Sequence, residues 1–108
     1  MQDLISDMEV DLLVEYGRAS EENGPYFNSI PEAYAIIKEE FEEATEEAEM
    51  FKQHFDKLWK QIRRNTPPEQ TLDNLTIMRD LSLCAAAEWI QAAAMCYKTI
   101  KGIENART

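Results

Sequence analysis

Acidic side chains gather in one short stretch of the sequence. At about 100° of helix per residue, Glu40, Glu43 and Glu47 fall on one flank of an apolar stripe. Glu40 and Glu43 are neighbours at i and i+3, where like charges repel unless a divalent cation such as Mg²⁺ lies between their oxygens. A solvated acidic face is the alternative. By the same helical geometry, three other acids of the stretch are expected to point toward solvent: Glu42, Glu46 and Glu49.

A second candidate is Glu88, the only acid between Leu81 and Ile100. A carboxylate on an apolar helix face is costly unless it is paired or binds a metal. We therefore expect either a metal ion at Glu88 or a Lys, Arg or backbone partner. Gln91 and Asp80 lie on the flank of the same face, within reach of a shared site. The apolar residues of that face are Ile77, Leu81, Cys84, Ala92 and Met95.

Other kinds of chemistry find little support in the sequence. His54 is the only histidine, too few for a zinc site or a catalytic triad, and we expect it at the surface. Cys84 and Cys96 lie twelve residues apart in one predicted helix, about 18 Å, so they cannot form a disulfide. We expect them to be buried thiols in a reducing compartment.

The composition predicts one all-α domain over residues 1–108. Three glycines and four prolines in 108 residues are too few for many strands and turns. No apolar run approaches the roughly 18 residues of a membrane span, and the N-terminus lacks a basic leader, so we expect a cytoplasmic protein without a membrane partner. A net charge of −10 disfavours nucleic acid as a partner, although bridging cations would permit a phosphorylated small molecule.

Three helices are predicted from the spacing of apolar residues and from residues typical of helix starts and ends. The first covers residues 2–22 and ends at Asn23-Gly24-Pro25. The second starts at a capping box with Ser29 as N-cap and Glu32 at N3, and runs to about residue 64. The third helix starts at a second capping box, formed by Thr66 and Glu69 with Pro67 at N1, and ends near Gly102. The last two helices form a long antiparallel hairpin.

The apolar residues of the third predicted helix also indicate self-association. Between Leu81 and Ile100 apolar residues face nearly every direction, and the other two helices of a small chain can cover only part of that surface. A homo-oligomeric helical bundle, a homodimer or homotetramer, would bury the remainder. The residues expected at that interface are Ala86, Trp89, Ala93 and Tyr97.

Two stretches resemble a known family. The segment Phe27-Asn28-Ser29-Ile30-Pro31-Glu32-Ala33-Tyr34-Ala35-Ile36-Ile37-Lys38-Glu39-Glu40-Phe41-Glu42-Glu43 resembles the start of the metal-binding helix of MazG-like nucleoside triphosphate pyrophosphohydrolases. The segment Glu88-Trp89-Ile90-Gln91-Ala92-Ala93-Ala94-Met95 resembles the second motif of a small, often phage-associated branch. The resemblance covers roughly residues 10–100.

The resemblance implies an oligomeric all-α enzyme that converts a nucleoside triphosphate to the monophosphate and pyrophosphate. It implies Mg²⁺, with Mn²⁺ as a substitute, held by Glu40, Glu43 and Glu88. Glu39 or Glu47 would be the general base. Gln91, Lys98 and Asn28 would contact the substrate, although Gln91 stands where the family pattern has Asp.

Two alternatives remain beside this enzyme. One is a catalytically weak helical oligomerisation module with the same fold. The other is a Mg²⁺-dependent nucleotide binder without turnover.

Overall fold

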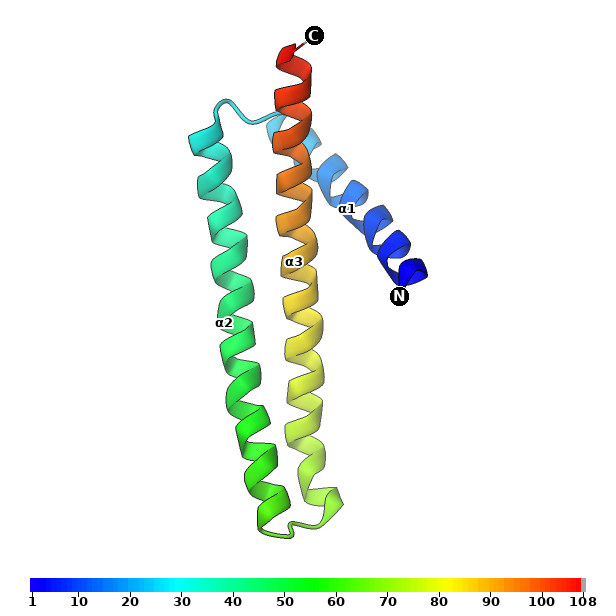
Figure 1. The fold of residues 1–108 in the computed structure, drawn as a ribbon, viewed down its shortest axis with the longest axis vertical. Helices are drawn as coiled ribbons and strands as arrows, with labels where there is room; N and C mark the ends of the chain where they lie inside the picture. Colours follow the sequence, from blue (N-terminus) through cyan, green and yellow to red (C-terminus); the bar gives the residue numbers. More distant parts are fainter. Residues whose placement is uncertain (108) are drawn as a thin grey trace. The chain divides into compact units, whose positions relative to one another are not determined.

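The computed structural model describes residues 1–107, and regular structure in this range is entirely helical. The elements are α1 (Gln2–Asn23), α2 (Ile30–Arg63), a 3-10 turn η1 (Pro68–Thr71) and α3 (Leu72–Arg107). α2 and α3 lie side by side and run in opposite directions (Figure 1). The predicted all-α class and the helix hairpin are therefore confirmed. None of the described helices is long and apolar enough to cross a membrane.

The chain divides into two compact units. The first contains residues 1–41 and the C-terminal part from residue 88, so it holds α1, the start of α2 and the end of α3. The second contains residues 42–87, which form the rest of α2, the turn and the beginning of α3.

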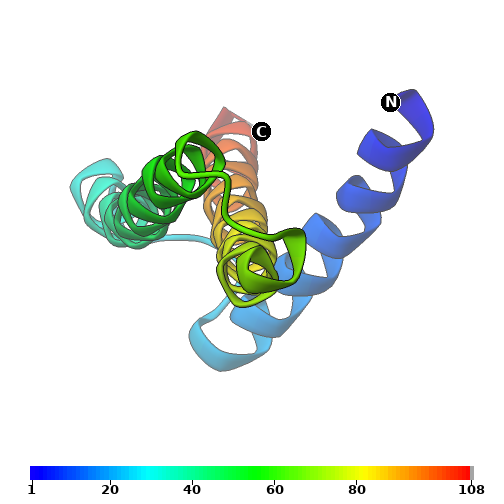
Figure 2. The same ribbon diagram turned by 90° about the horizontal axis from the view of Figure 1, so that it is seen from below.

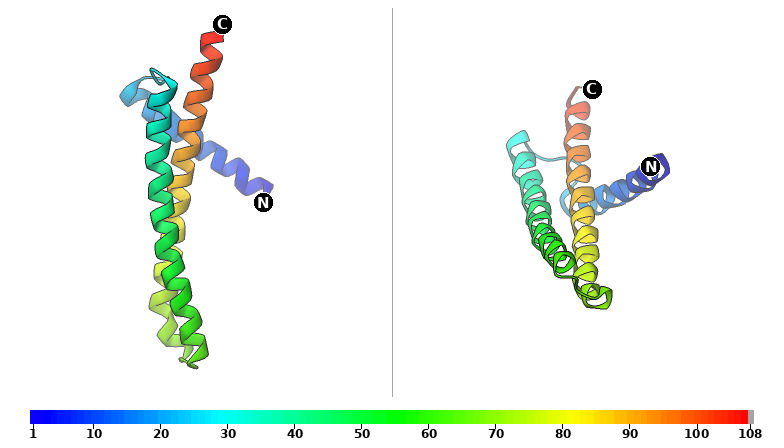
Figure 3. Two further views of the ribbon diagram at one scale, coloured as in Figure 1. Left: turned by 60° about the vertical axis from the view of Figure 1, so that its left-hand side comes forward. Right: turned by 60° about the horizontal axis from the view of Figure 1, so that its bottom comes forward.

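In the first unit, α1 ends where the sequence predicts. Gly24 has φ 86° and ψ 163°, a backbone conformation that side chains with a Cβ rarely adopt, and its N–H donates to the carbonyl of Ser20 at 2.8 Å. The ring of Tyr16 packs edge-on against Tyr97 of α3, 5.0 Å between centroids. Tyr97, expected at an oligomer interface, is therefore half-buried under α1. The N-terminal end of α1 leads away from α3 (Figures 2 and 3), and none of the residues of α1 is itself buried.

The start of α2 also agrees with the prediction. The backbone N–H of Glu32 donates to Oγ of Ser29 at 3.2 Å, which is the first half of the capping box. Pro31 lies in the first turn, where its missing N–H removes no helical hydrogen bond. This cap fixes where the helix carrying the acidic stretch begins.

Both predicted ends of the third helix are wrong. The chain does not become helical at Pro67, whose ψ of 142° is extended, because Pro68 disfavours the α conformation in the residue before it. The 3-10 turn follows instead, and α3 begins at Leu72. At the other end α3 continues through Gly102 to Arg107. A Cβ at Gly102 would lie 3.6 Å from Cβ of Tyr26, an ordinary van der Waals distance, so this glycine neither ends the helix nor is required by its contact with Tyr26.

The second unit has a polar interior that the sequence analysis did not predict. Asn74 is only 2% exposed, and its Oδ1 lies 2.8 Å from Nδ1 of His54. Its Nδ2 donates to the backbone carbonyl of His54 at 2.9 Å. The predicted surface position of His54 is therefore wrong, because this histidine is half-buried and joins α2 to α3.

The two cysteines are a further correction. Cys84 and Cys96 are free thiols, as the spacing along one helix requires, but both are exposed rather than buried. Both thiols are therefore in contact with solvent.

Candidate functional site

Two acids from different helices meet in the first unit. One carboxylate oxygen each of Glu40, on α2, and Glu88, on α3, lie within 4.8 Å of one another, and both residues are half-buried. Glu43 follows Glu40 by one turn of the unbroken α2, is exposed, and brings a carboxylate oxygen to within the same distance. The structure thus brings together the three residues predicted as metal ligands.

The side-chain amide of Gln91 faces two of these carboxylates. Its hydrogen bonds are satisfied when the nitrogen points toward the acids, and Nε2 then donates to Oε2 of Glu40 at 2.8 Å and to Oε2 of Glu88 at 3.1 Å. A neutral donor therefore bridges the two anions. Because Gln91 lies about one turn after Glu88 on α3, both side chains reach Glu40 from the same side of that helix.

The two candidate bases differ in their surroundings. Glu39 is exposed on α2. Glu47, one turn after Glu43 on the same helix, is half-buried, and its Oε2 is buried without a hydrogen-bond donor from the described residues. A buried acceptor without a donor is unfavourable by about 1–3 kcal/mol. Glu47 is therefore the better placed of the two to take a proton from a bound water.

The remaining acids lie apart from this group. Glu42, Glu46 and Glu49 are exposed, as the helical sorting predicts. Asp80, which the sequence places within reach of Glu88, instead forms an ion pair with Arg79 at 3.2 Å and is largely exposed. Asp80 is thus not a candidate ligand in this arrangement.

Lys98 is a buried cation in the first unit. Only 3% of the residue is exposed, and its Nζ lies 4.3 Å from the centroid of the Phe27 ring. The ring face attracts the ammonium group and replaces part of its lost hydration. Lys98 follows Gln91 by seven residues, about 10 Å of helix, which places both on similar sides of α3.

A pocket of about 380 Å³ opens beyond Lys98, where the link before α2 meets the end of α3. Asn28, predicted to contact the substrate, is one of its lining residues. Others are Tyr26, Phe27, Thr99, Ile103 and Asn105. From the sequence, Tyr26 and Phe27 are expected to be core or interface aromatics, with base stacking as the alternative, and nothing local signals that Phe27 meets a lysine 71 positions away.

The donor set suits a hard divalent cation. Three carboxylates supply oxygen ligands of the kind that Mg²⁺ and Mn²⁺ take, and two of them come from separate helices whose packing fixes their distance. Glu40, Glu43 and Glu88 are thus able to hold such an ion, with Glu47 further along α2.

In comparisons with models of protein families, with curated proteins and with solved structures, no match to this chain is found.

Proposed function

We propose that this protein is a Mg²⁺-dependent nucleoside triphosphate pyrophosphohydrolase, which produces a nucleoside monophosphate and pyrophosphate. The observation that carries the proposal is the meeting of Glu40 and Glu88 across two helices, with Glu43 one turn away. Three carboxylates so close together repel one another, and a divalent cation would relieve that repulsion. The resemblance of both motifs to MazG-like enzymes supports the same activity.

In this proposal the three acids hold the cation, which supplies charge neutralisation at the phosphate oxygens. Water adds to phosphorus at the anhydride between the α- and β-phosphates, the bridging P–O bond breaks, and pyrophosphate leaves. Glu47 receives the proton of the water, because its buried Oε2 can accept a hydrogen bond and the described residues supply no donor to it. Glu39, which is exposed, is the weaker candidate.

The order of groups along α3 supports a substrate lying lengthwise in the first unit. Glu88 and Gln91 come first, Lys98 follows two turns later, and the pocket beside Thr99 and Ile103 comes last. The triphosphate would thus face the acids, Lys98 would offset phosphate charge, and the nucleoside would enter the pocket. Phe27 keeps Lys98 in place when no anion is present.

A specific observation favours the alternative, a catalytically weak helical oligomerisation module. The Gln91 amide already satisfies one oxygen of Glu40 and one of Glu88, so these two acids can be held together without a cation. An acid at this position would instead have added to the repulsion and made the ion necessary. The two candidates therefore differ in whether a cation displaces the amide.

Incubation with a panel of ribo- and deoxyribonucleoside triphosphates in Mg²⁺ or Mn²⁺ tests the proposal. The enzyme should release monophosphate and pyrophosphate in equal amounts. A folded protein that binds Mn²⁺ but yields neither product from any nucleotide would support the module instead.

A further inference from the structure

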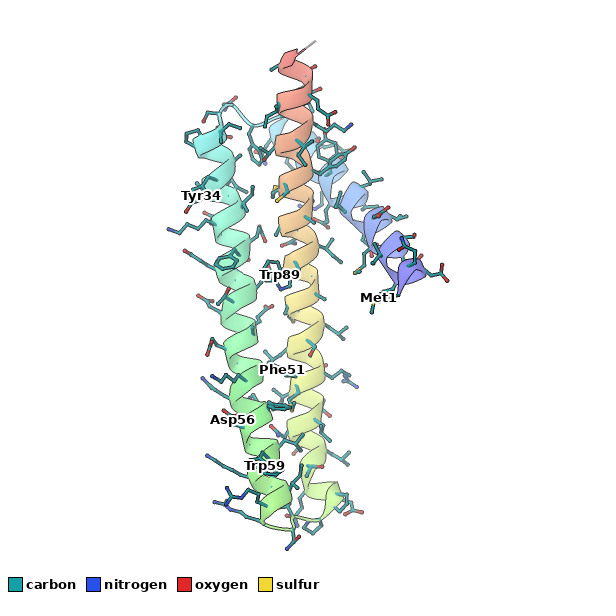
Figure 4. All side chains as sticks on the ribbon, viewed as in Figure 1. Met1, Tyr34, Phe51, Asp56, Trp59 and Trp89 are labelled. Atoms are coloured by element: carbon teal, nitrogen blue, oxygen red, sulfur yellow. The ribbon has the colours of Figure 1, made fainter. Side chains whose placement is uncertain are left out.

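Three basic side chains line a pocket of about 320 Å³ at the turn between α2 and α3, within the second unit: Lys60, Arg63 and Arg64. They lie at i, i+3 and i+4, so they project from one side of the chain. Arg64 keeps this geometry just past the helix, because its N–H donates to the carbonyl of Lys60 at 3.1 Å. The pocket lies at the lower end of α2 in Figure 4, below the labelled Trp59.

The three bases are exposed, and none of them has an ion pair or a side-chain hydrogen bond with another described residue. Even Asp56, one turn before Lys60 and labelled in Figure 4, forms no ion pair with it. Bases elsewhere in the chain do pair with a neighbouring acid: Arg18, Arg79 and Lys101. Like charges at this spacing repel one another, and an anion bound between them would relieve the repulsion.

The turn after α2 holds the walls of the pocket in one geometry. Asn65 has a φ of 53°, and its N–H donates to the carbonyl of Ile62 at 3.1 Å. The N–H of Thr66 donates to the carbonyl of Gln61 at 3.0 Å, which completes a Schellman cap. The side chain of Gln61 donates to the carbonyl of Gln70 at 3.3 Å. The chain itself therefore satisfies these carbonyls, and the basic side chains are not required as their partners.

The positive charge is local, which limits the shape of a ligand. Residues 57–68 contain four bases and no acid, whereas the whole second unit, residues 42–87, contains nine acids and six bases. A nucleic acid would extend past the pocket toward carboxylates, without a basic stripe along which to bind. At about 320 Å³ the pocket is at the small end of the range for ligand sites, roughly 300–1,000 Å³. A compact anion with several charges suits it best.

Phosphate groups match these side chains chemically. A guanidinium group donates two parallel hydrogen bonds to phosphate oxygens, and a lysine adds a point charge. The C-terminus of a helix contributes only about half a negative charge, which three full positive charges outweigh.

We propose that Lys60, Arg63 and Arg64 bind a chain of adjoining phosphates, as in pyrophosphate, tripolyphosphate or a nucleotide, without a metal ion. The acids Glu40 and Glu88 would need a cation to hold phosphate, whereas these bases attract it directly. The site belongs to the second unit alone and does not depend on the chain being an enzyme.

Isothermal titration with tripolyphosphate, in chelator and at low salt, tests the proposal. The wild type should bind, and Arg63→Gln/Arg64→Gln should bind about 100-fold more weakly, about tenfold for each arginine. Lys52→Gln/Lys57→Gln is the matched control, since it removes the same charge from exposed positions of α2 outside the pocket, and it should lose little affinity. Equal losses in the two double variants overturn the site, as does a wild type that does not bind in chelator.

Backbone amide shifts of the wild-type chain locate the anion even if a variant fails to fold. Tripolyphosphate should shift the amides of residues 59–66. Shifts confined to residues 27–29 and 98–103 would place the anion beside Lys98 and overturn the proposal. Equal affinity for tripolyphosphate and a nucleoside triphosphate identifies the phosphate chain as the whole ligand, and tighter binding of the latter identifies a nucleotide. Tighter binding of a single-stranded oligonucleotide than of either overturns the compact ligand.

Discussion

Nδ1 of His54 lies 2.8 Å from Oδ1 of Asn74, inside the second unit. Because Nδ2 of Asn74 donates to the backbone carbonyl of His54, the orientation of the amide is fixed and Oδ1 must accept. Nδ1 of His54 therefore carries a hydrogen. Two helices are joined here by a reciprocal pair of hydrogen bonds between one side chain on α3 and one residue of α2.

We predict that Asn74→Leu destabilises the protein by about 2 kcal/mol, since it leaves Nδ1–H of His54 without an acceptor in a half-buried place and removes the second hydrogen bond to a carbonyl that α2 already pairs. Urea unfolding at a fixed protein concentration measures this. Gln53→Leu makes the same amide-to-leucine change at an exposed position of α2 and should alter stability little. Equal unfolding midpoints for the two variants would show that the Asn74 pair contributes nothing.

Helix starts and ends could be predicted only where local chemistry decides them. The Ser29 cap was correct because one side chain and one N–H suffice for it. The start of α3 was missed because Pro68 overrides the capping box that begins at Thr66. Gly102 does not end α3, because a glycine inside a helix costs only about 1 kcal/mol and a long helix can continue past it.

For the site, helical periodicity could sort the acids of α2 by face, and the exposure of Glu42 and Glu46 agrees with that sorting. It could not determine which turn of α3 meets Glu40, because that depends on the register of the hairpin. Gln91 and Asp80 were therefore equal candidates from the sequence, and only Gln91 reaches the acids. The contact of Lys98 with Phe27 likewise depends on tertiary packing and could not be predicted from periodicity.

Addition of Mg²⁺ or Mn²⁺ should raise the melting temperature, since the ion relieves repulsion among Glu40, Glu43 and Glu88 in the folded state. At a free concentration one hundred times the dissociation constant, the gain is about 2.7 kcal/mol, or a shift on the order of 10 °C. Thermal melts with and without millimolar Mn²⁺ measure it. Glu46→Gln should keep the shift and Glu40→Gln should lose it; an unchanged melt in the wild type would argue against a metal site.

Single replacement of Glu40, Glu43 or Glu88 by Gln should lower pyrophosphate release by about 100-fold or more, because loss of a ligand exceeds the 10- to 100-fold effect of outer-shell changes. Glu42→Gln and Glu46→Gln remove the same charge from the exposed side of α2 and should leave the rate near that of the wild type. Equal loss at Glu42 would mean that net charge, rather than this group of acids, controls the rate.

The Gln91→Asp substitution should tighten Mn²⁺ binding by about tenfold, because a fourth carboxylate replaces the amide that now bridges Glu40 and Glu88. Without metal, the same variant should be less stable than the wild type, since the bridging donor is lost and a like charge is added. Isothermal titration with Mn²⁺ and a melt in chelator measure the two effects. Weaker Mn²⁺ binding in the variant would place the cation away from Gln91.

The most direct test of the proposed function is the ratio of pyrophosphate to orthophosphate released from nucleoside triphosphates in Mg²⁺. The wild type should release pyrophosphate and monophosphate in equal amounts, with little orthophosphate, and activity should disappear in chelator and in Glu40→Gln. Release of orthophosphate alone would contradict the proposed reaction. So would the absence of pyrophosphate from every nucleotide tested with a folded, Mn²⁺-binding preparation.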